Sequence, residues 1–279
     1  MDDSTNGGLY GQVAIVTGGG RGIGRAIAFA LASAGVQVAI AARSENELSE
    51  TVQAIDHTGG RAMALPADVS DGAAVRWMVH EVEDKFGPVD LLVNNAGVSE
   101  PLGPIAGTDT DAWWRCFEVN VRGPFLCSQA VLAGMLPRGA GRIVHVASGA
   151  GTFSIPNLSA YAIGKTALIR FSETLAAETR GAGICSFSIA PGTVRTAMAE
   201  SLLNHPNGEQ WFPWFRQTVE DGRDVPPERG ADLVLRLASG RYDALSGCFL
   251  YIEDDLDLLL SHADRIQRER LYSLGLKRL

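Results

Sequence analysis

Short runs of apolar, often β-branched residues recur along the chain, separated by longer segments whose apolar residues return every three to four positions. The short runs predict buried strands and the longer segments predict amphipathic helices. Strands are expected at about 12–17, 36–41, 61–67, 89–93, 142–147, 183–190 and 247–252. The clearest helices are expected at about 25–34, 45–57, 71–86, 109–136 and 158–178. The Gly123-Pro124 pair is expected to bend or interrupt the fourth of these. Because strands and helices alternate almost from end to end, the pattern predicts a single α/β domain.

A glycine-rich loop separates the first expected strand from the first expected helix. It reads Thr17-Gly18-Gly19-Gly20-Arg21-Gly22-Ile23-Gly24. Glycines let the backbone turn tightly and approach a pyrophosphate, whose charge then lies at the helix N-terminus. A flexible surface turn is the alternative, but such turns seldom lie between a buried strand and a buried helix. The loop therefore predicts a dinucleotide site, with these contacts: Gly18, Gly20, Arg21, Gly22, Ile23 and Gly24.

The residues at the end of the second strand indicate which dinucleotide the protein binds. An acid at this place holds the ribose diol of NAD, whereas an arginine accommodates the 2′-phosphate of NADP. Here Ala42 is followed by Arg43 and Ser44, and Arg21 lies in the glycine loop. We expect NADP(H) to be preferred over NAD(H), which stays possible because either arginine could be an ordinary solvated charge.

The stretch from Ser148 to Lys165 is a candidate for acid–base chemistry. Ser148 directly follows the strand expected at 142–147. Tyr161 and Lys165 lie one turn apart on the following helix. A phenol with an ordinary pKa of about 10 is a poor base at neutral pH. We expect the Lys165 ammonium to lower the pKa of Tyr161, so that the phenol exchanges a proton with an alcohol oxygen held by Ser148. The alternative is an amphipathic helix with a core tyrosine and a solvated lysine.

Composition narrows the remaining possibilities. The 279 residues are 46% hydrophobic and 20% charged, with a mean hydropathy of +0.06, which is ordinary for a globular protein with ample core. A net charge of −8 and a pI of about 5.2 argue against a nucleic acid or an anionic membrane as partner. The scattered cysteines and histidines have no metal-binding spacing, which favours reduced thiols, no metal and a cytoplasmic location. No signal peptide is expected in Met1–Gly8, nor any membrane-spanning run.

Taken together, these motifs resemble the single-domain branch of the short-chain dehydrogenase/reductase family, over about residues 10–251. The matching motifs are Thr17-Gly-x-x-x-Gly22-x-Gly24, Asn94-Asn-Ala-Gly97, Ser148, Tyr161-x-x-x-Lys165 and Pro191-Gly-x-x-x-Thr196. Their order and spacing agree jointly. The resemblance implies a Rossmann-type, doubly wound parallel sheet of seven strands with helices on both faces, which binds a nicotinamide dinucleotide.

The resemblance also implies roles for individual residues. Tyr161 would be the general acid/base, with Lys165 lowering its pKa and holding the nicotinamide ribose. Ser148 would polarise the carbonyl, and Asn120 would hold a water in a proton relay from Lys165. The implied cofactor contacts are Asp68 and Val69 at the adenine, Asn95, Ala96 and Gly97 near the ribose, and Pro191, Gly192, Val194 and Thr196 around the nicotinamide.

Two regions depart from the usual family pattern. The segment 193–227, the substrate lid in this family, carries the clustered aromatic residues Trp211, Phe212, Trp214 and Phe215. They could line the mouth of a site for a bulky hydrophobic ketone, or they could bury against a neighbouring helix. The extension 253–279 could place an apolar stripe on a neighbouring subunit or cap its own; the stripe is Leu256, Leu259, Leu260 and Ile266. Residues 1–9 are expected to be flexible, and a homotetramer or homodimer is expected.

The sequence thus predicts an NADP(H)-dependent oxidoreductase that transfers a hydride between the nicotinamide and a fairly hydrophobic ketone or secondary alcohol. The alternatives are an NAD-dependent dehydrogenase of the same family, a nucleotide-sugar isomerase or dehydratase, and a cofactor-binding protein without catalysis. The chain is short for the second, which usually carries a larger substrate domain. An intact set of Ser148, Tyr161, Lys165 and Asn120 argues against the third.

Overall fold

In a computed structural model, which describes residues 8–276, the chain forms one parallel sheet of seven strands. The order across the sheet is β3-β2-β1-β4-β5-β6-β7. The strands are β1 (Val13–Thr17), β2 (Gln37–Ala42), β3 (Arg61–Pro66), β4 (Leu91–Asn94), β5 (Gly141–Val146), β6 (Ile184–Ala190) and β7 (Phe249–Tyr251). Each lies within about two residues of its predicted place, so the predicted fold class is confirmed.

The central strands are apolar throughout because both faces of the sheet are covered. In β1, Val13 and Ile15 pack into the core on one face, while Ala14 and Val16 pack into the core on the other. All four are buried. The absence of an apolar–polar alternation in this run is the sequence signature of a parallel sheet with helices on both sides.

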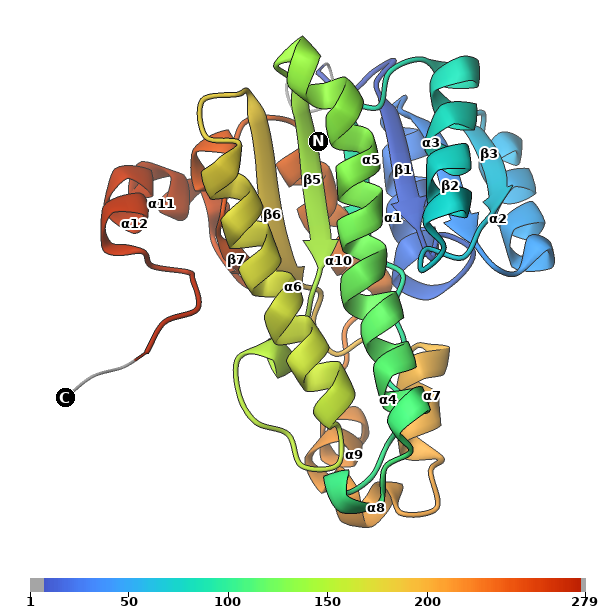
Figure 1. The fold of residues 1–279 in the computed structure, drawn as a ribbon, viewed down its shortest axis with the longest axis vertical. Helices are drawn as coiled ribbons and strands as arrows, with labels where there is room; N and C mark the ends of the chain where they lie inside the picture. Colours follow the sequence, from blue (N-terminus) through green and yellow to red (C-terminus); the bar gives the residue numbers. More distant parts are fainter. Residues whose placement is uncertain (1–7, 277–279) are drawn as a thin grey trace.

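Helices cover the two faces in separate groups (Figure 1). The apolar residues of α1, α2 and α10 pack into one core, and those of α3, α5 and α6 pack into the other. The helices are α1 (Gly22–Ser33), α2 (Glu45–His57), α3 (Gly72–Phe86), α4 (Thr110–Phe117), α5 (Gly123–Arg138), α6 (Ser159–Glu178), α7 (Ala197–Leu203), α8 (Gly208–Trp211), α9 (Pro213–Glu220), α10 (Pro227–Ala238), α11 (Leu256–Ser261) and α12 (Ala263–Glu269).

The long helix expected at 109–136 is interrupted near its middle. A five-residue π-helical turn, Glu118–Arg122, joins α4 to α5. Gly123 follows, where a Cβ would stand 2.8 Å from the Val69 side chain, so the start of α5 can approach that loop only with glycine. A π-helical turn inside a helix is frequent at functional sites, and this one carries the buried Asn120.

The C-terminal extension packs on its own chain. Leu256, Leu259 and Ile266 are all buried in the core that α1 and α10 share with the sheet. These three residues of the stripe therefore pack within their own chain, and contact of the extension with a neighbouring subunit stays a prediction. At the other end Leu9 is 1% exposed, so the segment expected to be flexible is packed from that residue onward, while residues 1–7 lie outside the described part.

Candidate active site

A cavity of about 960 Å³ runs along the carboxyl ends of the strands, from the glycine loop to the helices α7 and α9. The strand order reverses between β1 and β4, and a ligand crevice is expected at such a switch point. Every predicted site residue except Asn120 lines this cavity. The fold thus brings together side chains from six separate loops and from α6.

Close packing shapes the glycine loop between β1 and α1. Gly18 has a φ of +66°, and a Cβ there would stand 2.8 Å from the amide nitrogen of Asn95. A Cβ on Gly24 would stand 2.2 Å from the Gly18 carbonyl oxygen. The Asn95 amide donates hydrogen bonds to the carbonyls of Thr17 (2.9 Å) and Gly18 (3.2 Å). Asn95, expected near the cofactor ribose, therefore holds the glycine loop against the end of β4.

The first turn of α1 suits an anion. Its preceding residue, Arg21, provides no side-chain cap, and the turn contains no acidic residue. The free backbone N–H groups and the helix dipole favour a phosphate at this place. This end of the cavity fits the pyrophosphate of a dinucleotide.

Two arginines lie at the glycine-loop end of the same cavity. Arg43 and Ser44 follow β2, and Ser44 caps α2 by accepting a hydrogen bond from Glu47 N (3.4 Å). Arg21 Nη1 lies 3.3 Å from Glu47 Oε1. Glu47 also lines the cavity and was not predicted from the sequence, because only the fold brings the first turn of α2 to the glycine loop. Two guanidinium groups at this position fit a nucleotide with an additional phosphate.

Asp68 is an ionised acceptor at the rim of the cavity. Its Oδ1 accepts hydrogen bonds from Ser70 N (2.9 Å) and Oγ (2.6 Å), and its Oδ2 accepts one from Arg115 Nη2 (2.7 Å). Burial raises the pKa of Asp68, but the hydrogen bonds from Ser70 and Arg115 outweigh it and the pKa is lowered. The carboxylate is thereby fixed in position beside Val69, at the place where the adenine was expected.

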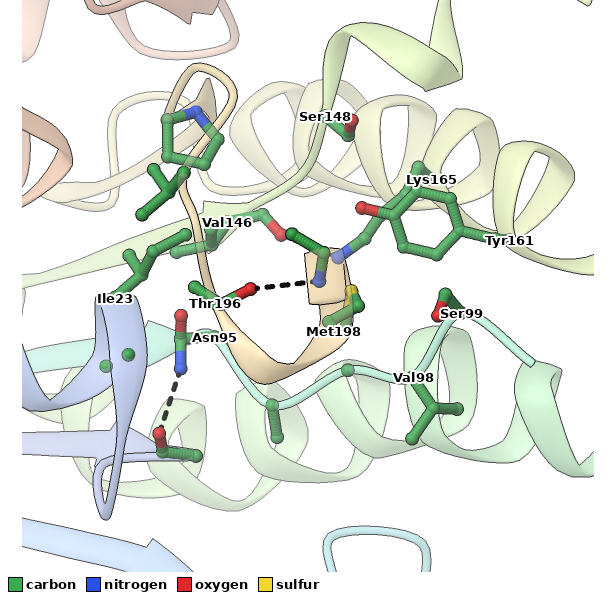
Figure 2. A pocket seen from close by; sticks show the side chains of 18 of the residues that line it. Ile23, Asn95, Val98, Ser99, Val146, Ser148, Tyr161, Lys165, Thr196 and Met198 are labelled. Atoms are coloured by element: carbon green, nitrogen blue, oxygen red, sulfur yellow. Dashed lines mark hydrogen bonds between the residues drawn. The ribbon is translucent and has the colours of Figure 1, made fainter. Parts of the chain in front are cut away.

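Ser148, Tyr161 and Lys165 meet in the middle of the cavity (Figure 2). The Tyr161 hydroxyl points toward the end of the Lys165 side chain, whose Nζ lies 5.5 Å from the centre of the phenol ring. Lys165 Nζ donates a hydrogen bond of 2.8 Å to the carbonyl of Val146. The Ser148 Oγ accepts a hydrogen bond from Ala150 N (3.1 Å), which orients the hydroxyl at the end of β5. The spatial convergence expected from the sequence is present.

The direction of the Tyr161 pKa shift differs from the expectation. Burial of the phenol raises its pKa above the ordinary value, although a hydrogen bond from Ser148 acts to lower it. Burial also lowers the pKa of Lys165 to about 8, so the lysine still carries its charge at neutral pH. The expected net lowering of the Tyr161 pKa is wrong for this arrangement of side chains, because desolvation of the phenolate is the largest effect on it.

Asn120 is fully buried and lies behind the cavity wall. Its Nδ2 donates to the Val98 carbonyl (2.7 Å) and to Cys116 Sγ (3.1 Å), and its Oδ1 accepts from Val98 N (3.0 Å). A Cβ on Gly97 would stand 2.8 Å from that Oδ1 and 3.5 Å from Lys165 Nζ. The Asn120 amide therefore fixes the loop after β4, which forms the wall beside Lys165. Sequence reasoning missed the partners Val98 and Cys116.

Apolar side chains form the wall opposite the glycine loop, and most of them were not predicted. They are Phe153, Ile155, Leu158, Met198, Leu202, Trp214 and Phe215. The aromatic residues of the segment 193–227 show both expected arrangements, burial in the fold and exposure to the cavity. Phe212 is 1% exposed and packs inside, whereas Trp214 and Phe215 line the cavity. Trp211 stacks on His205 with their ring centres 4.8 Å apart.

Residues 8–276 contain no cluster of metal-ligating side chains. Cys116, Cys127, Cys185 and Cys248 are free thiols. None of the described helices combines the length and the apolar character needed to cross a bilayer.

Comparisons with known proteins agree with this site. The family model for short chain dehydrogenases matches residues 12–207. A short chain dehydrogenase of Pseudocercospora fijiensis is 38% identical, covering 96% of this chain and 90% of that protein. A variant of the actinorhodin polyketide ketoreductase, solved with NADPH, superposes with a TM-score of 0.80 at 33% identity, covering 86% of this chain and 95% of that one.

A solved xylitol dehydrogenase with bound NAD⁺ is 27% identical and superposes with a TM-score of 0.81, covering 88% of this chain and 98% of that one. Relatives with either nicotinamide cofactor thus share the fold. The family match, the seven-stranded sheet and the cavity lined by the glycine loop, Ser148, Tyr161 and Lys165 lead to one assignment. The chain belongs to the short-chain dehydrogenase/reductase family, whose members are NAD(P)-binding oxidoreductases acting on CH–OH and C=O groups.

Proposed function

We propose that this protein is an NADP(H)-dependent reductase of hydrophobic ketones, able to run in reverse on the corresponding secondary alcohols. The observation that carries the proposal is the position of the Tyr161 hydroxyl, beside Ser148 and Lys165 and in the same cavity as the glycine loop. A bound dinucleotide supplies a hydride to the substrate carbon. The residues of the chain then have to hold the carbonyl oxygen and supply its proton.

Tyr161 suits the donation of that proton. Because burial raises its pKa, the phenol keeps its proton at neutral pH and can pass it to a carbonyl oxygen as negative charge develops there. The Ser148 hydroxyl hydrogen-bonds the same oxygen and orients it. Lys165 is charged at neutral pH, and its ammonium stabilises the phenolate that remains after the transfer. The protonated phenol is the form of Tyr161 that reduction requires.

The charges at the glycine-loop end of the cavity support a preference for NADP(H). Arg21 and Arg43 lie at the end of the cavity where a 2′-phosphate would be bound, and the end of β2 carries no acid to hold a ribose diol. The salt bridge between Arg21 and Glu47 is exposed and therefore weak, so a phosphate can compete for the guanidinium. Related structures contain NADPH or NAD⁺, so NAD(H) is the alternative cofactor.

The substrate class follows from the apolar wall. Phe153, Leu158 and Phe215 face the cavity beside Tyr161, so burial of a bulky hydrophobic ketone is favourable there. A structural relative is named as a ketoreductase of a polyketide. The free thiols suit the cytoplasm, and we expect a homotetramer or homodimer there.

The test is a steady-state assay of nicotinamide oxidation by the purified protein, with a panel of monocyclic and bicyclic ketones and with NADPH or NADH. We expect ketone-dependent oxidation of NADPH, a kcat/KM that rises with the apolar size of the ketone, and a lower kcat/KM with NADH. A higher kcat/KM with NADH would replace the NADP(H) assignment. Tight binding of NADPH without turnover of any ketone or alcohol would instead indicate a cofactor-binding protein.

A further inference from the structure

Tyr251, the last residue of β7, lines the cavity but has no part in the proposed transfer of a hydride and a proton. Its backbone pairs with Ala190 at the end of β6. Its side chain packs against a cluster that contains Phe249 and the α6 residues Leu168 and Ile169, on the face of the sheet that α6 covers. The side chain therefore reaches the cavity from the sheet edge farthest from the glycine loop.

The hydroxyl of Tyr251 lies beside the turn that carries Ser148. A Cβ on Gly149 would stand 3.6 Å from Tyr251 Cε1 and 3.7 Å from its hydroxyl oxygen. The hydrogen bonds of Tyr251 involve its backbone, and within residues 8–276 no protein group bonds the hydroxyl. A phenol can donate one hydrogen bond and accept others, so this group is available to a ligand in the cavity.

The position of the phenol is fixed by its surroundings. Tyr251 N donates to Asp254 Oδ2 (2.7 Å), and Asp254 N donates back to the Tyr251 carbonyl (3.1 Å). Phe249 N donates to the Tyr272 carbonyl (2.8 Å), so the C-terminal segment holds the free edge of β7. The rings of Tyr251 and Phe249 meet edge to face, with centres 4.9 Å apart. A polar group held in this way can select a ligand at little entropic cost.

The neighbouring charges indicate what the phenol would bind. Glu253 lines the cavity and is exposed, and it would repel a carboxylate on the ligand. Arg195 and Arg223 also line the cavity, but each is already paired with a carboxylate of the chain, Glu200 and Asp221 respectively. The wall beside Tyr161 is apolar, as described above. A neutral oxygen on an otherwise hydrophobic molecule satisfies both conditions.

We propose that Tyr251 is a specificity-determining residue, which hydrogen-bonds a second neutral oxygen of the substrate while Ser148 and Tyr161 hold the reacting carbonyl. The substrate is then an uncharged, largely apolar ketone with a further hydroxyl or carbonyl group on its skeleton. This inference rests on the proposed ketone reduction and adds the chemistry of the substrate to it.

The experiment compares tetralone with each of its monohydroxylated forms as substrates, using the wild-type protein, Tyr251→Phe and Tyr10→Phe. Tyr10 is 83% exposed and does not line the cavity, so its variant controls for the loss of a tyrosine hydroxyl elsewhere. We expect the wild type to have a KM about tenfold lower for at least one hydroxylated form than for tetralone. Tyr251→Phe removes this difference by raising the KM of the hydroxylated form alone, and Tyr10→Phe preserves it.

Two results would overturn the inference while leaving the proposed function intact. One is a wild type that reduces tetralone and all its hydroxylated forms with the same KM. The other is a Tyr251→Phe variant that keeps the preference or raises both KM values equally. If none of the ketones tested causes the wild type to oxidise NADPH, the proposed function is refuted, and this inference with it.

Discussion

Lys165 Nζ donates a hydrogen bond to the carbonyl oxygen of Val146 over 2.8 Å, which ties the first half of α6 to the last residue of β5. Ser148 lies two residues beyond Val146, so this bond fixes the lysine relative to the serine hydroxyl. Lys165 is only 4% exposed, and a buried ammonium needs such a partner. The bond holds two of the three proposed catalytic side chains in one arrangement before any ligand enters.

Cofactor preference should depend on Arg43. Arg43→Asp places a carboxylate where a 2′-phosphate would lie, and it supplies the acid that holds a ribose diol. We expect kcat/KM to fall by at least about tenfold with NADPH and to rise with NADH. Arg268→Asp, on the exposed face of α12, is the matched control and should change neither value. An unchanged ratio of the two cofactors in Arg43→Asp would remove the argument for NADP(H).

The C-terminal extension should stabilise the fold of its own chain. Ile266 is 3% exposed in the main core, whereas Leu258 on the neighbouring helix is 56% exposed. We expect Ile266→Ala to lower the free energy of unfolding by about 2–4 kcal/mol, and Leu258→Ala by no more than about 0.5 kcal/mol. Urea unfolding followed by circular dichroism measures both. Equal losses in the two variants would contradict the packing of α12 on its own subunit.

Alkaline pH should destabilise the protein through its buried thiols. Burial raises the pKa of Cys127 and Cys248 to about 12, and that of Cys116 and Cys185 to about 11, from 9.0 in an exposed thiol. Below pH 9 both the folded and the unfolded chain are protonated at these thiols. Above it only the unfolded chain loses those protons, so stability falls as pH rises toward the folded pKa values.

Lys165 opposes this trend but is a single group. Its pKa is lowered from 10.5 to about 8, so between these values the unfolded chain binds more protons at this residue and stability rises with pH. We expect the four thiols to outweigh it between pH 9 and 11. The test compares urea unfolding of the wild type and Cys127→Ala at pH 8 and pH 10. The variant should lose less stability over this interval, by about 1 kcal/mol, and an identical loss would show that Cys127 does not titrate as described.

The sequence was sufficient to predict the sheet and the motif residues at the ends of its strands, because both depend on local patterns. The apolar runs of β1 and β5 have no polar alternation, and the glycine loop follows β1 directly, so their positions could be assigned without tertiary information. The convergence of Tyr161 and Lys165 followed from one helical turn of spacing.

What the sequence did not predict depends on contacts between distant segments. Glu47 reaches Arg21 only because α2 packs beside the glycine loop. Asn120 bonds Val98 only because the loop after β4 packs against the π-helical turn. The Gly123-Pro124 pair indicated an interruption of this helix, but it did not indicate the partners of Asn120. The pKa of Tyr161 was assigned the wrong direction because burial of the phenol could not be judged from its spacing to Lys165.

The most direct test of the account is the comparison of Tyr161→Phe with the wild type in two measurements, NADPH binding by fluorescence titration and turnover of a ketone. The variant lacks only the hydroxyl that is proposed to give its proton to the carbonyl oxygen. We predict an unchanged affinity for NADPH and a kcat lower by about 10²–10⁴, with Tyr10→Phe matching the wild type in both. A Tyr161→Phe variant that turns over the ketone at the wild-type rate would contradict the account.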